Sequence, residues 1–384
     1  MNCVICHSQQ LNYFDQYSLL KRVTSDCKPW PAGGELTICT ACGAVQKIVN
    51  ERWLTEINQI YSEYEAYYQA GGEEQAVFNK ETGAPMKRSQ QLVKFIKESG
   101  LFNSETGKVL DYGCATGGFL SAFSIVYEQA ELFGFDLSKK YEARLETIKN
   151  FRQLFTGSID ATEKFHVISL IHSLEHLVTP VQTLEQLKEH LHTEGFLFIQ
   201  VPNIVENPFD ILVADHLLHF TPDSLSNLLD KAGFEVKLLS TDAASKELSV
   251  IAAPAKNQLT LGSSNRVSHY VTNKALVDHH LQLMSRLLSD VAALSAQGDF
   301  AIFGTSISAT WVYGYHPEVS CFIDEDPNRI GKEYFGKPIY SPVQIPQGMT
   351  TYIPLSKQMV KNIKARFAQQ NFKLNSPYDE RAAV

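Results

Sequence analysis

The segment Val109-Leu-Asp-Tyr-Gly-Cys-Ala-Thr-Gly-Gly-Phe-Leu120 joins an apolar run to an amphipathic stretch through a glycine-rich turn. The apolar run ends at Leu110, and the amphipathic stretch begins at Phe119. Gly113 and Gly117 let the backbone turn tightly and come close to a ligand, because a Cβ would block both. The segment therefore predicts a strand, a glycine turn and the N-terminus of a helix.

A second short strand, Leu132-Phe-Gly-Phe-Asp136, ends in an acidic side chain that is suited to hold ribose hydroxyls. The spacing Asp-x-Gly-x-x-x-Gly that begins at Asp111, followed by a strand-end acid, resembles the class I S-adenosylmethionine (SAM) methyltransferases. It differs from the dinucleotide pattern Gly-x-Gly-x-x-Gly, because Asp111 stands at the first glycine place. The bland alternative is an ordinary strand, turn and helix of a doubly wound sheet.

Strands and helices alternate beyond this segment. Residues 166–171 and 195–201 read as buried strands, and residues 181–191 and 224–232 read as helices. This alternation predicts an α/β fold with a doubly wound, mostly parallel sheet covered on both faces, whose ligands lie beyond the carboxyl ends of the strands. The SAM-binding residues expected from this layout and the resemblance are Asp111, Gly113, Cys114, Gly117, Asp136, Leu137, Ser158, Ile159 and His172, with Ser158 and Ile159 in the loop near adenine.

Two Cys-x-x-Cys pairs lie near the N-terminus, Cys3-Val-Ile-Cys6 and Cys39-Thr-Ala-Cys42. Each pair predicts a tight knuckle whose two thiolates converge on one tetrahedral ion. Four sulfurs suit Zn²⁺, and a closed shell of four leaves no open position for catalysis, so the site would be structural. Gly43 stands where a positive φ helps the second knuckle turn. The alternative is a set of buried or redox-active cysteines.

Composition narrows the classes of function. The chain has 384 residues, 44% of them hydrophobic, and a formal net charge of −8. The negative balance argues against an extended nucleic-acid surface, which needs a basic face. The sequence has no apolar run long enough for a membrane span and no signal peptide. We therefore expect a cytoplasmic protein that acts on a small molecule, as a monomer or homodimer.

The stretch of residues 51–69 carries aromatic and apolar side chains at helical spacing. A stripe of this kind predicts an amphipathic helix. The bland interpretation is a helix that packs on the next domain. The sharper one is that Tyr67 and Tyr68, near its end, reach into a substrate cleft.

Three domains are expected. Residues 1–72 would hold the zinc-binding region and the aromatic helix, and residues 73–257 the SAM-binding methyltransferase domain. Residues 258–384 would form a smaller, Rossmann-like domain, in which residues 300–306 begin a second strand-and-turn unit. The strict glycine fingerprint of a nucleotide site is absent there.

The layout resembles the three-domain SAM-dependent sugar C-methyltransferases that act on nucleotide-linked deoxysugars. The resemblance rests on the two knuckles, the glycine turn, Ser173-Leu-Glu-His176, Asp215-His216, and Gly304-Thr-Ser306 with Phe322-Ile-Asp324. It implies a structural zinc, SAM in the middle domain, and a nucleotide sugar between the middle and last domains.

The resemblance also implies roles for residues of the cleft. His216 would be the base, Asp215 its acidic neighbour and His176 a second polar group. An acidic neighbour can orient an imidazole and raise its pKa. The sequence departs from the better-known members at Val213, where they carry tyrosine, and at Asp215, where they carry glutamate. Tyr67 or Tyr68 would then polarise the substrate carbonyl.

Three functions remain open on sequence grounds. The first is SAM-dependent C-methylation of an activated keto sugar. The second is O- or N-methylation of a sugar or secondary metabolite on the same fold. The third is a non-catalytic zinc-containing scaffold, which the presence of Asp111, Gly113, Gly117 and Asp136 disfavours.

Overall fold

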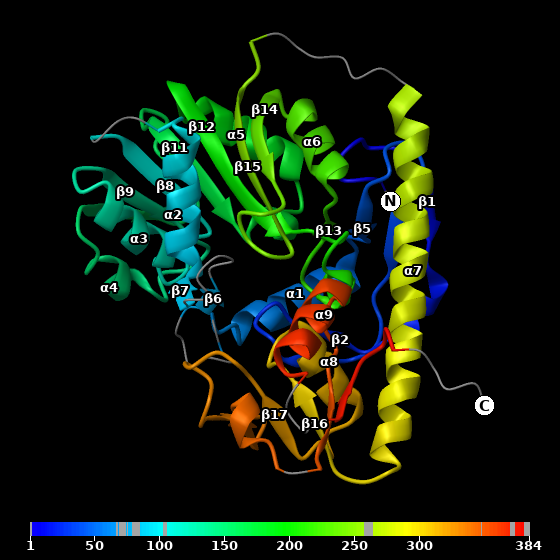
Figure 1. Ribbon diagram of the computed structural model, residues 1–384. Coiled ribbons are helices and arrows are strands. Elements are labelled where there is room, and N and C mark those ends of the chain that lie inside the picture. The colour runs from blue at the N-terminus through cyan, green and yellow to red at the C-terminus, as the bar shows by residue number, and fades with distance from the viewer. Residues whose placement is uncertain are drawn as a thin grey trace.

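The computed structural model describes residues 2–66, 68, 74, 76–78, 85–102, 106–256, 264–346, 348–368 and 373–379. Within these residues the chain builds a four-stranded, a seven-stranded and a six-stranded sheet, together with two two-stranded ribbons. In Figure 1 the seven-stranded sheet lies at the upper left, and strands β16 and β17 of the six-stranded sheet lie below it. Among the described residues no helix combines the length and the apolar character needed to cross a membrane.

The seven-stranded sheet has the order β10-β9-β8-β11-β12-β15-β14. Its first five strands are parallel, whereas β15 runs antiparallel to both of its neighbours. This is the doubly wound, mostly parallel sheet that the sequence predicts. The strands are β8 (Lys108–Tyr112), β9 (Glu131–Phe135), β10 (Phe151–Phe155), β11 (Phe165–Ile171), β12 (Leu191–Pro202), β14 (Phe234–Ser240) and β15 (Glu247–Pro254).

Helices cover both faces of this sheet. Alternate residues of a strand face opposite sides, so Val109 packs with helices α2 and α3, whereas Leu110 packs with α5 and α6. The two cores hold the carboxyl ends of the strands in place. The helices are α2 (Arg88–Ser99), α3 (Gly118–Val126), α4 (Glu142–Leu145), α5 (Pro180–Glu189) and α6 (Pro222–Lys231).

The four-stranded sheet joins the N-terminal segment to the middle of the chain. Its order is β1-β4-β5-β13, and β13 (Leu218–His219) pairs antiparallel with β5. The expected N-terminal unit of residues 1–72 therefore receives its edge strand from the central part of the sequence. The other elements here are β1 (Leu11–Tyr13), β2 (Arg22–Val23), β3 (Pro29–Trp30), β4 (Leu36–Cys39), β5 (Val45–Lys47) and the 3-10 helix η1 (Asp15–Leu19).

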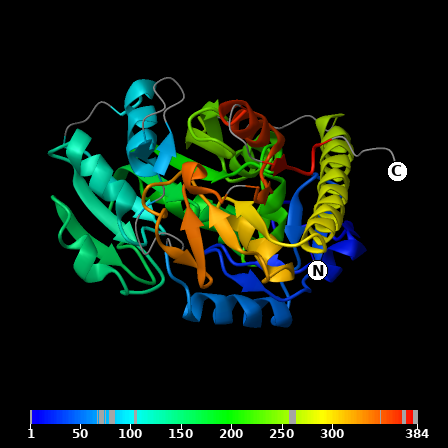
Figure 2. The same ribbon diagram turned by 60° about the horizontal axis from the view of Figure 1, so that its bottom comes forward.

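Helix α1 (Glu51–Ser62) is shorter than the predicted stretch of residues 51–69. Its N-terminus is capped by the Asn50 side chain, which accepts a hydrogen bond from the Trp53 backbone at 2.8 Å. Beyond the helix, two lysines hold the chain in a non-helical path: Lys28 donates to the Glu63 carbonyl at 2.5 Å, and Lys140 to the next carbonyl at 2.6 Å. Figure 2 shows α1 along the lower edge of the molecule.

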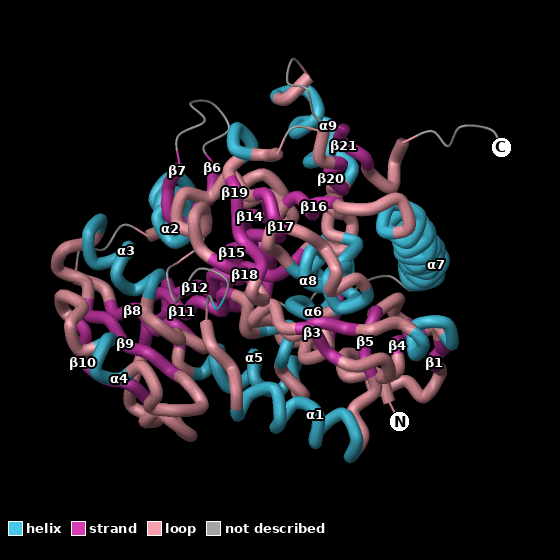
Figure 3. Tube along the Cα trace, turned by 90° about the horizontal axis from the view of Figure 1, so that it is seen from below, coloured by secondary structure: helices cyan, strands magenta, loops and turns pink. Residues whose placement is uncertain are grey.

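The C-terminal part begins with the long helix α7 (Ser264–Ser295), which runs along one side of the molecule in Figure 1. Figure 3 shows it beside β1 and β4, and Asn273 of α7 donates to the Gly43 carbonyl at 2.9 Å. The sheet that follows has the order β18-β19-β17-β16-β20-β21. Its elements are β16 (Phe300–Phe303), α8 (Ile307–Tyr315), β17 (Cys321–Ile323), β18 (Glu333–Tyr334), β19 (Lys337–Tyr340), η5 (Pro342–Gln344), β20 (Thr350–Tyr352), α9 (Lys357–Arg366) and β21 (Lys373–Asn375).

Trp311 of α8 ties the C-terminal sheet to the N-terminal segment. Its side chain is fully buried, and its indole N–H donates to the Lys21 carbonyl at 2.6 Å. We expect Trp311→Ala to lower the free energy of unfolding by about 3–5 kcal/mol, because it leaves a cavity and an unpaired carbonyl. Leu19→Ala, at a side chain that is 77% exposed, should change it by less than about 0.5 kcal/mol. Urea unfolding of both variants tests this; equal effects would contradict it.

Candidate active site

One cavity lies where the three parts of the chain meet, with a volume of ≈ 290 Å³. Residues 25–27 and Tyr64 come from the N-terminal part, and Ser306, Ile307 and Arg329 come from the C-terminal part. The carboxyl ends of the large sheet, the loops that follow them and the start of α2 supply most of the rest. These include Asp111, Gly113, Cys114, Ala115, His172, His176, Asp210, His216 and Glu247. The cavity thus contains most of the polar residues that the sequence placed at this edge.

The glycine turn after β8 forms one wall. Gly113 and Gly117 have φ of 88° and 75°, a region that residues with a Cβ rarely adopt. A Cβ on Gly113 would lie 2.8 Å from the Ser173 side chain. The backbone N–H groups of Gly113 and Cys114 donate to the Phe135 carbonyl at 2.8 and 3.1 Å. The turn is therefore fixed by its neighbours at the place predicted.

The two acids of the predicted SAM motif have different surroundings. Asp111 is buried and accepts a hydrogen bond from the Ser169 hydroxyl at 2.8 Å. Burial raises its pKa to about 7, against the lowering effect of that bond. Asp136 is half-buried and accepts hydrogen bonds from the backbone of Ala115 at 3.0 Å and Ser138 at 3.3 Å. It lies beside the turn, outside the cavity lining.

His172 lies at the end of β11 with φ of 51°, between two carboxylates. Its Nδ1 is 3.2 Å from Glu175 Oε1, and its Nε2 is 3.2 Å from Glu247 Oε2. Burial opposes the charge of the imidazole, but Glu247 and Glu175 outweigh it and raise the pKa of His172 to about 9. His172 is therefore a cation at neutral pH.

Buried polar atoms at this wall lack hydrogen bonds within the described part of the chain. Arg88 donates through Nη2 to Glu247 Oε1 at 3.1 Å, but its Nε has no partner. Glu247 Oε2 makes no hydrogen bond, although the His172 ring lies at ion-pair distance. Unsatisfied buried groups are costly, so this wall fits a ligand that carries both a cation and a carboxylate.

The opposite wall holds a pair of imidazoles on one carboxylate. Asp210, in the 3-10 helix η4 (Pro208–Leu212), accepts from His216 Nδ1 at 2.8 Å and from His219 Nδ1 at 2.6 Å. Both imidazoles and the carboxylate are buried. Burial opposes ionisation of Asp210, but the two imidazoles hold its pKa well below the usual range.

His216 is the imidazole of this pair that lines the cavity. Burial lowers its pKa, and the Asp210 carboxylate more than offsets this, so the pKa lies above the usual value of 6.5. A proton on Nδ1 directed at Asp210 leaves Nε2 as the basic nitrogen. This arrangement, a carboxylate that orients an imidazole, is suited to general-base chemistry.

His176, in η3 (Leu174–His176), lies edge-on to His216, with ring centroids 4.7 Å apart. Its Nδ1 is 3.0 Å from the Tyr61 hydroxyl and 3.0 Å from the Asp215 carbonyl. Burial, followed by the charge of His216, lowers the pKa of His176. It is therefore a neutral polar group of the cleft, as predicted.

Asp215 makes no hydrogen bond to the His216 ring among the described residues, although its charge helps to raise the pKa of His216. Asp215 is buried and accepts from the backbone and hydroxyl of Ser25, at 2.8 and 2.5 Å. Its carboxylate lies 3.6 Å from His176. Residues adjacent in the sequence point to opposite sides of this loop, so the partner of His216 is Asp210, six residues earlier.

The predicted role of Tyr68 is wrong. Its side chain is 37% exposed and lies beside Phe335 of the C-terminal part, because α1 ends at Ser62 and the chain then turns. Tyr61 and Tyr64 from the same aromatic stripe approach the cleft instead. Tyr67 lies outside the described residues.

Several predicted SAM-binding residues do not line the cavity. Leu137 is 80% exposed, Ser158 is exposed and Ile159 is half-buried in the core beside β10. Gly117 lies behind the turn, where a Cβ would lie 2.5 Å from Leu145. Their contact with a cofactor stays a prediction.

Sequence reasoning missed four groups of this site. Asp210, Arg88 and Glu247 come from three separated segments, and no motif links them. Lys47 is fully buried on β5 behind the imidazole pair. The one sequence signal for Lys47 is its place at the end of the short strand Val45–Lys47. A lysine that is fully buried there needs partners, because lysine is almost never fully buried without them.

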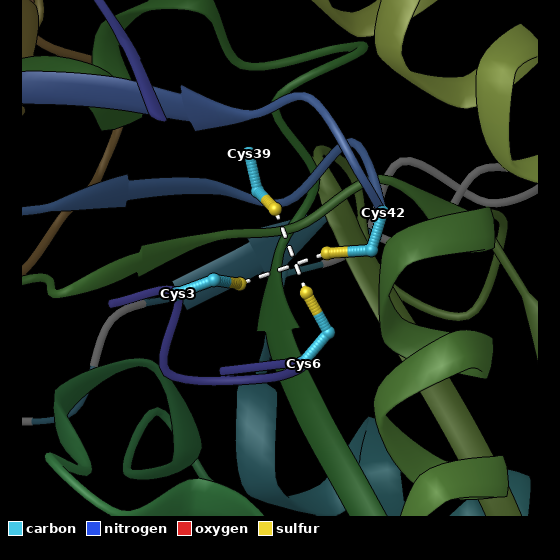
Figure 4. Close-up of side chains that lie close together, drawn as sticks. All are labelled: Cys3, Cys6, Cys39 and Cys42. Carbon is cyan, nitrogen blue, oxygen red and sulfur yellow. Dashed lines mark hydrogen bonds between the residues drawn. The ribbon is translucent and has the colours of Figure 1, made fainter. Parts of the chain in front are cut away.

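The four cysteines of the knuckles converge as predicted. Their sulfurs all lie within 4.8 Å of one another, with Cys3 and Cys42 3.6 Å apart and Cys6 and Cys39 3.5 Å apart. Figure 4 shows the four side chains directed at a common centre. Tetrahedral Zn²⁺ with Zn–S bonds of about 2.3 Å needs sulfurs about 3.8 Å apart. The cluster therefore fits this ion.

The two knuckles have the same backbone geometry. In the first, the His7 N–H donates to the Cys3 carbonyl, and in the second, the Gly43 N–H donates to the Cys39 carbonyl. Both residues have positive φ, 60° and 75°, as predicted for Gly43. His7 is thus the turn residue of the first knuckle, and its side chain is exposed.

Comparison with known families identifies the middle of the chain. Residues 86–239 match the family model described as a methyltransferase domain. The match includes the glycine turn, His172 and the imidazole pair. This part of the chain has the class I methyltransferase α/β fold. Its fold agrees with the strand order above and with the predicted resemblance to SAM-dependent methyltransferases. The match does not distinguish the sugar C-methyltransferases from other SAM-dependent methyltransferases.

Curated relatives of the methyltransferase domain have different activities. A tRNA U34 carboxymethyltransferase of Campylobacter jejuni subsp. jejuni serotype O:23/36 (strain 81-176) is 28% identical over 170 residues, 40% of this chain and 58% of the relative. A ubiquinone biosynthesis O-methyltransferase of Actinobacillus pleuropneumoniae serotype 7 (strain AP76) is 29% identical over 143 residues, 33% of this chain and 58% of the relative. The chain thus spans less than two thirds of either protein.

Solved structures resemble the domain more weakly. The CcbJ methyltransferase from Streptomyces caelestis has a TM-score of 0.36 at 15% identity, covering 44% of this chain and 95% of that one. A likeness at this level adds nothing on substrate or chemistry.

The charged state of His172 has a measurable consequence. Its folded pKa of about 9 lies above the unfolded value of about 6.5. The stabilisation is therefore complete below pH 6.5 and lost as the pH rises through 9. We expect the stability difference between wild type and His172→Gln to shrink by on the order of 2 kcal/mol from pH 6 to pH 10. Urea unfolding at both pH values checks this, and a constant difference would contradict it.

Proposed function

We propose that the protein is a SAM-dependent methyltransferase that methylates carbon next to the carbonyl of a nucleotide-linked keto-deoxysugar, with His216 as the base. The observation that carries the proposal is that the glycine turn and the Asp210-oriented His216 line the same cavity. A base beside a methyl donor is what C-methylation needs, since an acidic C–H must lose its proton before carbon can attack.

We propose that SAM binds between the wall formed by Arg88 and Glu247 and the wall formed by the glycine turn. The zwitterionic methionyl end of SAM matches the incompletely satisfied Arg88 and Glu247 wall. Asp136 would hold the ribose hydroxyls, with Gly113 and Cys114 close to the sulfur. SAM would supply an electrophilic methyl group, while the protein's own residues orient the substrate and move its proton.

The substrate proposal rests on the C-terminal wall of the cavity. Ser306 and Ile307 place the N-terminus of α8 there, beside the buried Arg329. Arg329 donates to Thr305 Oγ1 at 2.8 Å, and its guanidinium also lies 3.4 Å from the carboxylates of Asp324 and Asp326. The helix N-terminus suits a diphosphate. The net charge of −8 disfavours a folded RNA as substrate.

The proton transfers follow from the imidazoles. His216 Nε2 would take the α-proton, and Asp210 would stabilise the imidazolium that forms. Because the Asp215 carbonyl can only accept, His176 carries its proton on Nδ1. Its bare Nε2 would then accept a hydrogen bond from a substrate hydroxyl. O-methylation is the second candidate, because a curated relative is an O-methyltransferase and the same base could deprotonate a hydroxyl.

The base predicts a specific loss of activity. We expect His216→Asn to lower turnover by about 10²–10⁴-fold, the range for removal of a general base, with SAM affinity unchanged by calorimetry. His280→Asn is the matched control, since His280 is buried and bonded to a backbone carbonyl outside the cavity. Retained turnover in His216→Asn would remove this residue from the mechanism.

The acidic partner predicts a pH effect. Because Asp210 raises the pKa of His216, wild-type turnover should rise with pH through a midpoint above 6.5. Asp210→Asn should move that midpoint to lower pH and reduce the maximal rate.

With S-adenosylhomocysteine and a nucleoside-diphosphate keto-deoxyhexose in D₂O, the wild type should exchange the α-proton. Turnover without exchange would favour O-methylation, and no SAM binding would refute the methyltransferase.

The cysteine cluster predicts about one tightly held zinc per chain. Folding of this small segment is expected to depend on the ion, so Cys3→Ser should lower the thermal midpoint and release zinc. Cys321→Ser is the control, because Cys321 is buried in the C-terminal sheet. Metal analysis of protein purified without added zinc decides the question: a content below about half an equivalent, with Cys3→Ser folding normally, would refute the site.

A further inference from the structure

Lys47 stands directly behind the imidazole pair. It ends β5 and is fully buried. Burial lowers the pKa of Lys47 to about 7, and in the protonated form its ammonium donates to the Val213 carbonyl, to the His216 carbonyl at 2.9 Å and toward His219 Nε2 at 3.1 Å. An ammonium has three donors and no acceptor, so these three partners satisfy it completely.

The donors and acceptors along this chain of contacts determine the tautomers of the two imidazoles. The Asp210 carboxylate is an acceptor only, so both Nδ1 atoms that face it, of His216 and His219, carry protons. Lys47 offers a proton to His219 Nε2, so this nitrogen must be bare. The result is a continuous chain from Lys47 through His219 and Asp210 to His216, with one arrangement of protons.

We propose that Lys47 and His219 are positioning residues for the base, on the terms of the proposed function above. Lys47 donates to the bare Nε2 of His219 and so supports the tautomer that donates to Asp210, which in turn accepts from His216. His216 is left with its basic Nε2 toward the cavity. Lys47 also fixes the loop itself, since two of its acceptors are the carbonyls of Val213 and His216.

Removal of the lysine shows why it matters. Without Lys47, the buried Nε2 of His219 and the carbonyls of Val213 and His216 would lose their donor, although Asp210 would still require the proton on His219 Nδ1. The loop that carries the imidazole pair would then lose the side-chain contacts that tie it to Lys47. A buried network that is partly satisfied is strained and mobile.

The groups that surround the Lys47 ammonium define a control. Beside Asp210 and Asp215 stand Arg22, Glu56 and the Tyr17 ring, whose centroid is 5.8 Å from Nζ. Arg22 is equally buried and makes two hydrogen bonds to Glu56, at 2.9 and 3.0 Å, with no contact to the imidazoles. Arg22→Met therefore removes a buried cation from the same region without touching the chain of protons.

The test is imidazole ¹⁵N spectroscopy of the full chain labelled at histidine. In wild type, His219, assigned through His219→Gln, should show a protonated Nδ1 and a bare Nε2. In Lys47→Met the proton should stay on Nδ1, the Nε2 resonance should shift because this nitrogen has lost its donor, and turnover should fall at least about 10-fold with SAM affinity unchanged. Arg22→Met should keep the His219 pattern even if it lowers the thermal midpoint.

A second pair of variants covers the case in which Lys47→Met does not fold. A glutamine at position 219 can accept from Lys47 and donate to Asp210, whereas leucine can do neither. His219→Gln should therefore retain most of the turnover and His219→Leu should lose it. Equal turnover in these two variants, or an unchanged Nε2 resonance of His219 in Lys47→Met, overturns the proposal. Retained turnover in His216→Asn overturns the proposed function, and the positioning role with it.

Discussion

The Asp210 carboxylate is the group around which the site is built. It is buried, and it accepts one hydrogen bond from His216 and one from His219. A buried charge is tolerated only when it is paired and bonded on all sides, and removing one partner costs about 3–5 kcal/mol. The loop that carries all three residues is therefore held in one conformation, with one imidazole in the cavity and the other in the protein interior.

This constraint explains why the N-terminal segment is part of the candidate site. Strand β5 accepts β13 as its neighbour and carries Lys47, which reaches the same loop. The aromatic helix α1 adds Tyr61, which contacts His176. The cysteine knuckles at the end of β4 anchor a sheet too small to build its own core. A structural ion there would stabilise the sheet that carries Lys47, and through this sheet the loop with His216.

The sequence predicts local features well and long-range partners poorly. The doubly wound, mostly parallel sheet, the glycine turn and the four-cysteine cluster follow from the alternation of strands and helices and from short spacings in the sequence. The partner of His216 does not, because a loop can direct Asp215 away and bring Asp210 in without leaving a pattern. Lys47 and Glu247 meet the site through sheet pairing, which a single sequence does not specify. The sequence also places Tyr68 in the cleft, because no local signal marks the end of α1 at Ser62.

The central claim is that the methyl donor and the Asp210-oriented base share one cavity formed by all three parts of the chain. A crystal structure with S-adenosylhomocysteine tests it most directly. The account predicts the thioether sulfur inside that cavity, with His216 Nε2 close enough for a single substrate carbon to bridge the two. A sulfur outside the cavity, or a His216 ring turned so that Nε2 faces Asp210, would contradict it.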